Sequence, residues 1–142
     1  MVNGEVILRK LEKLREYVHT LKDAQDISWE RYKTDIRDRA FVERYLHMAI
    51  QTVFDIVNHI ISYQKWKEPE TNRESFEILA SNGVLPAEKV PVFQNMASFR
   101  NLLVHYYDKV DDEVVFGIFK NRLDDFDSFR EYIVEYLKKE KD

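Results

Sequence analysis

Residues 36–66 constrain the fold more than any other feature, because neither glycine nor proline interrupts this unusually long stretch. Its apolar residues recur at helical spacing and predict one continuous helix. They follow two lanes, the first made of Val42, Leu46, Ala49, Val53, Ile56 and Ile60 and the second of Ile50, Phe54, Val57 and Ile61. A helix that is apolar on two lanes is buried on more than one side. It therefore lies in the middle of a bundle or also meets a partner chain.

Similar spacing predicts helices along the rest of the chain. Apolar residues four and three positions apart predict the first helix, and Ser28 is placed to cap the second. Asn82-Gly83 is a helix-terminating pair, and Pro91 suits a first helical turn. The expected helices cover about 3–24, 28–34, 36–66, 73–82, 91–105 and 112–139. This pattern predicts an all-α fold of five to six helices.

The composition fits a small helical protein. The 142 residues include three glycines and three prolines, whereas β-sandwiches and barrels need many turns. The length predicts a single domain over residues 1–142. The chain has no cysteine, which excludes disulfides, cysteine-based zinc sites and a cysteine nucleophile.

The N-terminal sequence is charged where a secretory signal would be apolar. No apolar run approaches the roughly 20 residues that cross a bilayer. We therefore expect a cytoplasmic protein with no membrane partner.

A polar lane separates the two apolar lanes of residues 36–66. It comprises Arg44, His47, Gln51, Asp55, Asn58 and Ser62, with His59 one turn beyond Asp55. Asp55 and His59 stand four residues apart, a spacing that could hold a metal ion. Two ligands on one helix without further carboxylates favour hydrogen-bonding roles instead. Arg44, His47 and Asn58 either line the same groove or occupy polar positions near a subunit interface.

The densest polar patch holds Arg100, His105 and Tyr107 in the pattern Arg-x4-His-x-Tyr. Asn101 and His105 share one helix face with Ser98, and Arg100 lies about 100° round from Asn101. Histidine can take and return a proton near neutral pH, and arginine offers a planar fork of donors that matches a phosphate. Such groups suit phosphodiester transfer in RNA without a metal, which needs a base, an acid and a cation for the charge on phosphorus.

The number of histidines in the motif and the net charge of the chain each place a condition on this RNA chemistry. One histidine per chain falls short of an acid–base pair, so a symmetric dimer would supply the second. The net charge is −4, whereas proteins that bind nucleic acid regardless of sequence usually carry a basic excess. Any nucleic acid must therefore meet a local basic site. The spacing alone also fits a structural role, since a histidine near a helix C-terminus meets the helix dipole favourably.

Two blocks of the sequence resemble a known family. Residues 99–107, together with the following run Asp111-Asp112-Glu113-Val114-Val115, resemble the signature of the HepT family in the HEPN superfamily. Residues 42–51 and 55–61 resemble the central helix of that family. The likeness extends over most of the chain. It implies an up-and-down helical bundle that dimerises through its long helices, with the active cleft at the interface of the homodimer.

The resemblance also implies an activity, that of a metal-independent endoribonuclease acting on RNA as the toxin of a type VII toxin–antitoxin pair, without a cofactor. Arg100 and His105 would be the catalytic pair. Tyr107 would receive AMP from an MntA-type minimal nucleotidyltransferase antitoxin, which silences the toxin. The supporting residues would be Asn101, Asp55, Asn58, His59 and Ser98. The alternatives are a non-catalytic nucleotide-binding or docking subunit of a nucleotidyltransferase and a purely structural helical dimer.

Overall fold

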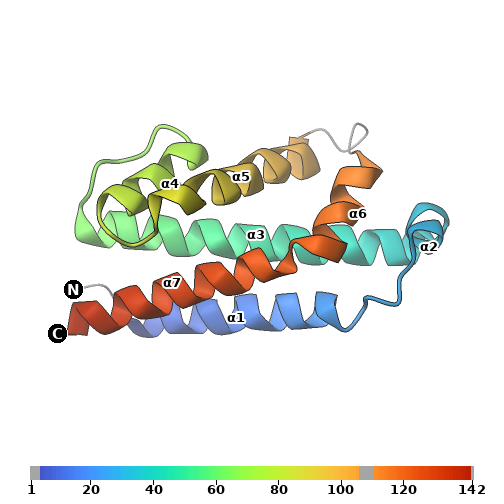
Figure 1. The fold of residues 1–142 in the computed structure, drawn as a ribbon, viewed down its shortest axis with the longest axis horizontal. Helices are drawn as coiled ribbons and strands as arrows, with labels where there is room; N and C mark the ends of the chain where they lie inside the picture. Colours follow the sequence, from blue (N-terminus) through green and yellow to red (C-terminus); the bar gives the residue numbers. More distant parts are fainter. Residues whose placement is uncertain (1–3, 106–110, 142) are drawn as a thin grey trace.

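This computed structural model describes the backbone of residues 4–105 and 111–141 and the side chains of residues 4–100 and 111–140. Within these ranges all of the regular secondary structure is helical. The order is α1 (Gly4–Lys22), α2 (Trp29–Thr34), α3 (Ile36–Gln64), α4 (Asn72–Ser81), the 3-10 turn η1 (Ala87–Lys89), α5 (Val90–His105), α6 (Asp112–Asn121) and α7 (Leu123–Lys141) (Figure 1). This confirms the predicted all-α fold. No helix in these ranges is long and apolar enough to cross a membrane.

The long helix α3 is the centre of the bundle, as its two apolar lanes predict. None of the ten lane residues is more than 3% exposed. Helix α3 packs against α1 on one side and against α4 and α5 on the other. The prediction that this helix is buried on more than one side is therefore confirmed.

Side chains and backbone geometry fix where α3 begins and ends. The Asp35 carboxylate accepts hydrogen bonds from the backbone N–H groups of Arg37 and Asp38 at the N-terminus. At the other end Lys65 takes left-handed dihedrals, with φ of 59° and ψ of 33°. Its N–H is bonded to the carbonyls of Ile61 and Ser62, which satisfies acceptors of the last turn. The helix thus stops two residues before the predicted residue 66.

The prediction of one final helix over 112–139 is wrong, because the chain turns at Arg122 and forms α6 and α7. Figure 1 shows α6 standing steeply against the direction of α7. The turn lets α6 pack on α2 and α3 while α7 packs along α1. One straight helix could not cover both surfaces. The described part of the chain therefore holds seven α-helices instead of five or six.

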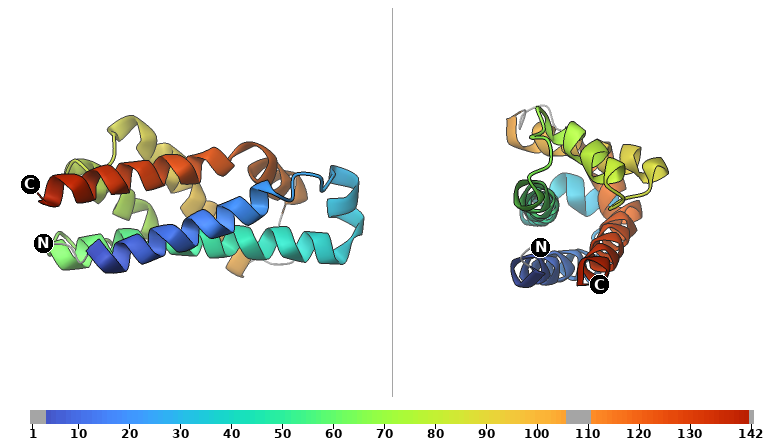
Figure 2. Two further views of the ribbon diagram at one scale, coloured as in Figure 1. Left: turned by 90° about the horizontal axis from the view of Figure 1, so that it is seen from below. Right: turned by 90° about the vertical axis from the view of Figure 1, so that its left-hand side faces the viewer.

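One long side of α3 is left uncovered by the other helices that the structure describes. In the end-on view of Figure 2, α1 lies on one side of α3 and α4 with α5 on the other, while α7 lies across the bundle. The view from below in Figure 2 shows the C-terminal end of α5 crossing α3 and emerging on this open side. The end of the helix that carries the sequence motif thus meets the helix that carries the polar lane.

Candidate functional site

The centre of the candidate site is a hydrogen-bonded chain that joins α5 to the polar lane of α3. Both Nε and Nη2 of Arg100 donate to Oε1 of Gln51, at 3.2 and 2.8 Å. Nε2 of Gln51 in turn donates to Oδ1 of Asp55, at 3.0 Å. The Arg100 guanidinium also stands 5.8 Å from the ring centroid of Phe54, within cation–π range. Arg100 is therefore held in one orientation by two residues of α3.

The orientation of the Gln51 amide follows from its two partners. An ionised carboxylate such as Asp55 only accepts hydrogen bonds, so the amide NH₂ faces Asp55. The amide oxygen then faces Arg100, which only donates. Because the group that holds Arg100 is neutral, the positive charge of the guanidinium is not cancelled. Nη1 and one Nη2 proton remain for a further acceptor such as a phosphate oxygen.

Two more basic side chains continue the lane towards the N-terminus of α3. His47 stands one turn before Gln51 and is half-buried, and Arg44 stands one turn before His47 and is exposed. Burial, and then the nearby charges of Arg100 and Arg44, lower the pKa of His47 below its ordinary value. The two guanidinium groups thus lie close enough to act on the same imidazole.

The supporting residues predicted from sequence are divided between two places. Asp55 belongs to the Arg100 chain through Gln51. Asn58 is exposed and faces a groove that begins one turn further along α3. Ser98 is exposed and accepts a hydrogen bond from Nη1 of Arg73 at 2.8 Å, so it tethers α5 to α4. It does not join the Arg100 chain.

His59 does not pair with Asp55 in the way that their spacing suggests. Asp55 bonds to Gln51, while the His59 ring stacks on Tyr63 with centroids 6.4 Å apart. Nε2 of His59 is buried and has no hydrogen-bond partner among the described residues. No three His, Asp or Glu side chains in the described ranges are arranged to hold a metal ion. The Asp55–His59 pair therefore has no third ligand there.

The other predicted site residues lie outside what the structure describes. His105 ends α5, but its side chain and that of Asn101 are outside the described residues, and so is Tyr107. Beyond this segment the start of α6 is attached to α3, because the Asp112 carboxylate accepts a hydrogen bond from Nη2 of Arg39. The motif segment is thus bounded by two attachments to α3, at Gln51 and Arg39, about 18 Å apart along the helix axis.

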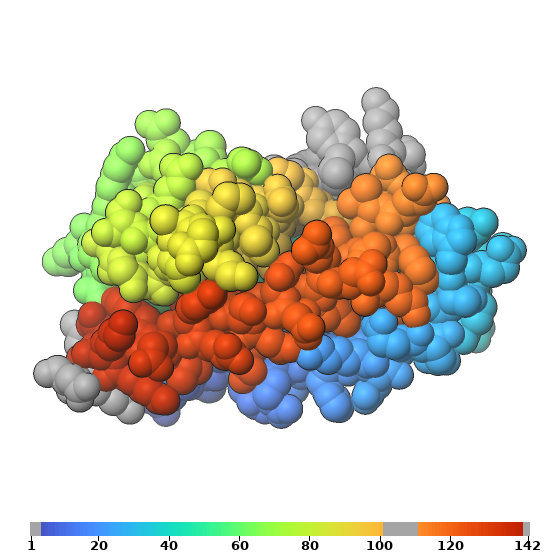
Figure 3. All heavy atoms as spheres, in the orientation of Figure 1, coloured from blue at the N-terminus to red at the C-terminus, as the bar shows by residue number. Residues whose placement is uncertain are grey.

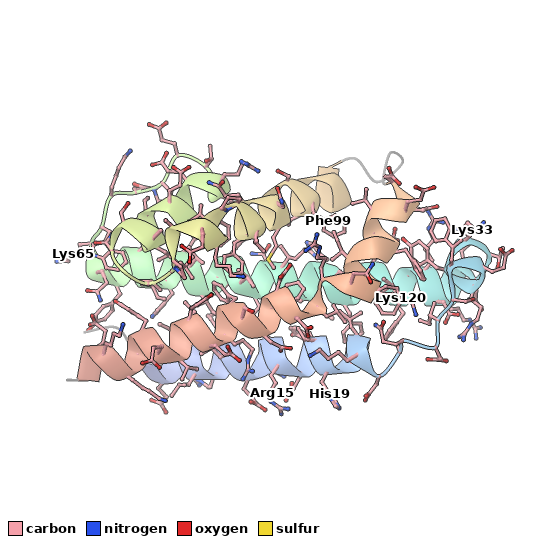
Figure 4. All side chains as sticks on the ribbon, in the orientation of Figure 1. Arg15, His19, Lys33, Lys65, Phe99 and Lys120 are labelled. Atoms are coloured by element: carbon pink, nitrogen blue, oxygen red, sulfur yellow. The ribbon has the colours of Figure 1, made fainter. Side chains whose placement is uncertain are left out.

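Two hollows adjoin α5. The larger, of about 920 Å³, lies between the end of α3, residues 65–71 and the start of α4, and both Asn58 and Arg73 line it. The smaller, of about 250 Å³, lies between α5 and the α6–α7 corner on the face drawn in Figure 3. Phe99, labelled in Figure 4, lines this smaller hollow. Most of its lining is apolar.

Gln51 is the site residue that the sequence prediction left out. It belonged to the polar lane, but no role was assigned to it. The available signal was a polar side chain placed between Ile50 and Val53 on a buried helix, four residues from both His47 and Asp55. A polar group in such a position needs a partner.

Comparison with known proteins identifies relatives over nearly the whole chain. Residues 7–133 match the family model described as HepT-like ribonuclease. The tRNA nuclease HepT of Aphanizomenon flos-aquae is 30% identical over 132 residues, which are 93% of this chain and 90% of the relative. The mRNA nuclease HepT of Shewanella oneidensis is 24% identical over 130 residues, which are 92% of this chain and 97% of the relative.

A solved structure shows the same fold. The tri-AMPylated HEPN toxin of Shewanella oneidensis, in complex with the MNT antitoxin, superposes with a TM-score of 0.83 at 25% sequence identity. The alignment covers 95% of this chain and 99% of that toxin. The helical bundle around α3 is therefore shared with this toxin along almost its full length.

Proposed function

Because the chain belongs to the family of HepT-like ribonucleases, we propose that it is an RNA-cleaving toxin of a toxin–antitoxin pair. The observation that carries this proposal is the orientation of Arg100. The motif arginine is held against α3 by a neutral amide, so that its charge is available to a phosphate. Curated relatives named as nucleases support the same activity.

In the proposed reaction, His105 takes the proton of a ribose 2′-hydroxyl, and the 2′-oxygen attacks the adjacent phosphorus. The bond from phosphorus to the 5′-oxygen breaks, and that oxygen takes a proton from a second, protonated His105, which the other chain of a dimer would contribute. Arg100 stabilises the negative charge that builds up on the phosphoryl oxygens. The products are a 2′,3′-cyclic phosphate and a 5′-hydroxyl, and no metal ion takes part.

A homodimer would complete this site. One His105 per chain cannot stand on both sides of the phosphorus, whereas two chains related by a twofold axis supply two histidines and two arginines. The open side of α3, where α5 emerges, is the surface on which we expect the partner's site residues to be added.

Tyr107 is the proposed point of control. An adenylate group on its hydroxyl would bring a bulky anion next to Arg100 and His105, which would occupy the phosphate site. The modified state of the Shewanella oneidensis toxin and its complex with an antitoxin support this assignment. The partner would be a nucleotidyltransferase antitoxin of the MntA type, and both proteins would act in the cytoplasm.

The test is RNA cleavage in EDTA by the wild type, Arg100→Ala and His105→Ala, after mass measurement confirms that Tyr107 carries no AMP. We expect cleavage by the wild type alone, with 2′,3′-cyclic phosphate or 3′-phosphate ends. The loss should exceed about a hundredfold, because each variant removes a group that acts in the transition state.

Wild-type rates from either variant would contradict the mechanism. Tight nucleotide binding by an unmodified wild type that cleaves no RNA would instead support the non-catalytic nucleotidyltransferase subunit. Thermal unfolding of each variant is the control that separates lost chemistry from lost structure.

A further inference from the structure

Arg44 adds a second, exposed guanidinium near the motif arginine, and both guanidinium groups act on the imidazole of His47. Arg44 and His47, together with Arg100 of α5, form a group of side chains here called the basic cluster. Arg44, His47 and Gln51 follow one another by three and four residues, so they share a helix face. Because Gln51 holds Arg100, the guanidinium of α5 is brought to the end of this row.

No carboxylate among the described side chains neutralises the two guanidinium groups of this cluster. Neither Arg44 nor Arg100 forms an ion pair with any described residue. The carboxylate next to Arg44 in sequence, Glu43, is directed to Arg39 on another side of the helix, at 3.9 Å. Asp55 reaches Arg100 only through the neutral amide of Gln51. The cluster therefore keeps its positive charge in a chain of net charge −4.

Towards the C-terminus of α3, basic and acidic side chains are mixed. One turn beyond Asp55, the groove of about 920 Å³ is lined by Lys65 and Arg73 but also by Glu68 and Glu70. The guanidinium of Arg73 already donates to the Gln94 carbonyl and to Ser98. A polyanion that enters the site is therefore attracted towards Arg44, away from the carboxylates of this groove.

We propose that Arg44 and His47 bind a phosphate of the RNA strand next to the phosphate held by Arg100, so that the strand runs along α3 towards its N-terminus. Arg44 supplies a charge and a fork of donors, and His47 supplies a ring N–H. These residues bind substrate and take no part in bond breaking. The proposal rests on the proposed function for its substrate class, but binding can be measured without cleavage.

The test uses the full-length protein and a fluorescein-labelled, single-stranded RNA in which every sugar is 2′-O-methylated. This probe has no free 2′-hydroxyl, so it cannot be cleaved by transfer to that oxygen. Affinity is measured by fluorescence anisotropy over a series of salt concentrations for the wild type, Arg44→Gln and His47→Gln. Arg9→Gln is the matched control, since Arg9 is an exposed arginine of α1 on another helix and its loss changes the net charge equally.

We expect Arg44→Gln to weaken binding about tenfold at low salt, and to reduce the slope of log K against log salt by about 0.7. His47→Gln should weaken binding less, and Arg9→Gln should match the wild type. With cleavable RNA, the two cluster variants should raise KM and leave kcat within about twofold.

An Arg44→Gln variant with the affinity and salt slope of the wild type would overturn the proposal, and so would a wild type that does not bind the probe. A loss of affinity shared equally by Arg9→Gln would also overturn it, since general charge would then explain the binding. If the probe binds through the cluster but unmodified RNA is never cut, the binding site stands and the proposed ribonuclease function fails.

Discussion

Gln51 holds Arg100 through an amide oxygen, and a carboxylate in its place would change the charge of the site. An ion pair would form with the guanidinium and would compete with a phosphate for the same donors. The amide thus orients the arginine and leaves its charge free. Sequence periodicity could predict that Gln51 is polar within the lane. It could not predict the partner, because that depends on the register between α3 and α5, which are far apart in sequence.

Gln51→Glu should therefore lower kcat for RNA cleavage by roughly 10- to 100-fold, the equivalent of one charge-assisted hydrogen bond of about 1.5–3 kcal/mol. The activity relative to the wild type should recover as the pH is lowered and the new carboxyl takes up a proton. Gln51→Met, which cannot form an ion pair, should lose less activity and show no such recovery. Gln51→Glu with the rate and pH profile of the wild type would exclude a positioning role.

At the scale of whole elements, apolar periodicity predicted a helix well where the burial of its own apolar face determines its course. Both lanes of α3 are buried as the spacing requires. The break at Arg122 could not be predicted in this way, because buried Phe119, Leu123 and Phe126 continue one apolar stripe across it. The signal present in the sequence was Asp124-Asp125, since acidic residues favour the first turn of a helix.

Two glycine-to-alanine substitutions, one inside a helix and one just after a helix, should have opposite effects on the free energy of unfolding. Gly117 lies inside α6, and a Cβ atom there would meet nothing within 4 Å, so Gly117→Ala should stabilise the protein by about 0.5–1 kcal/mol. Gly83 follows α4 with a φ of +79°, so Gly83→Ala should destabilise it by about 1 kcal/mol or more despite equally open space. Chemical denaturation measures both free energies of unfolding, and effects of the same sign would contradict this account of the backbone.

At the scale of the assembled molecule, the proposed cleft needs His105 from both chains, so one inactive chain should silence its partner. When equal amounts of the wild type and His105→Ala are unfolded together and refolded, roughly half of the dimers should be mixed, and each of these retains one His105. RNA cleavage by the mixture should therefore fall to about a quarter of that of the same total amount of refolded wild type. Cleavage at about half of the wild-type rate, with mixed dimers shown to form by differently tagged chains, would place a complete site within one chain.

Helix α3 gives two of its sides to the core and a third to the candidate site. Substitutions in the polar lane and substitutions in the apolar lanes therefore act on different properties of the molecule. Exchange of Arg44 or His47 alters what the surface attracts and leaves the packing of Leu46 and Val53 intact. A lineage with this architecture can therefore alter how tightly this surface attracts a polyanion by a few substitutions on one helix, with little change in the free energy of unfolding.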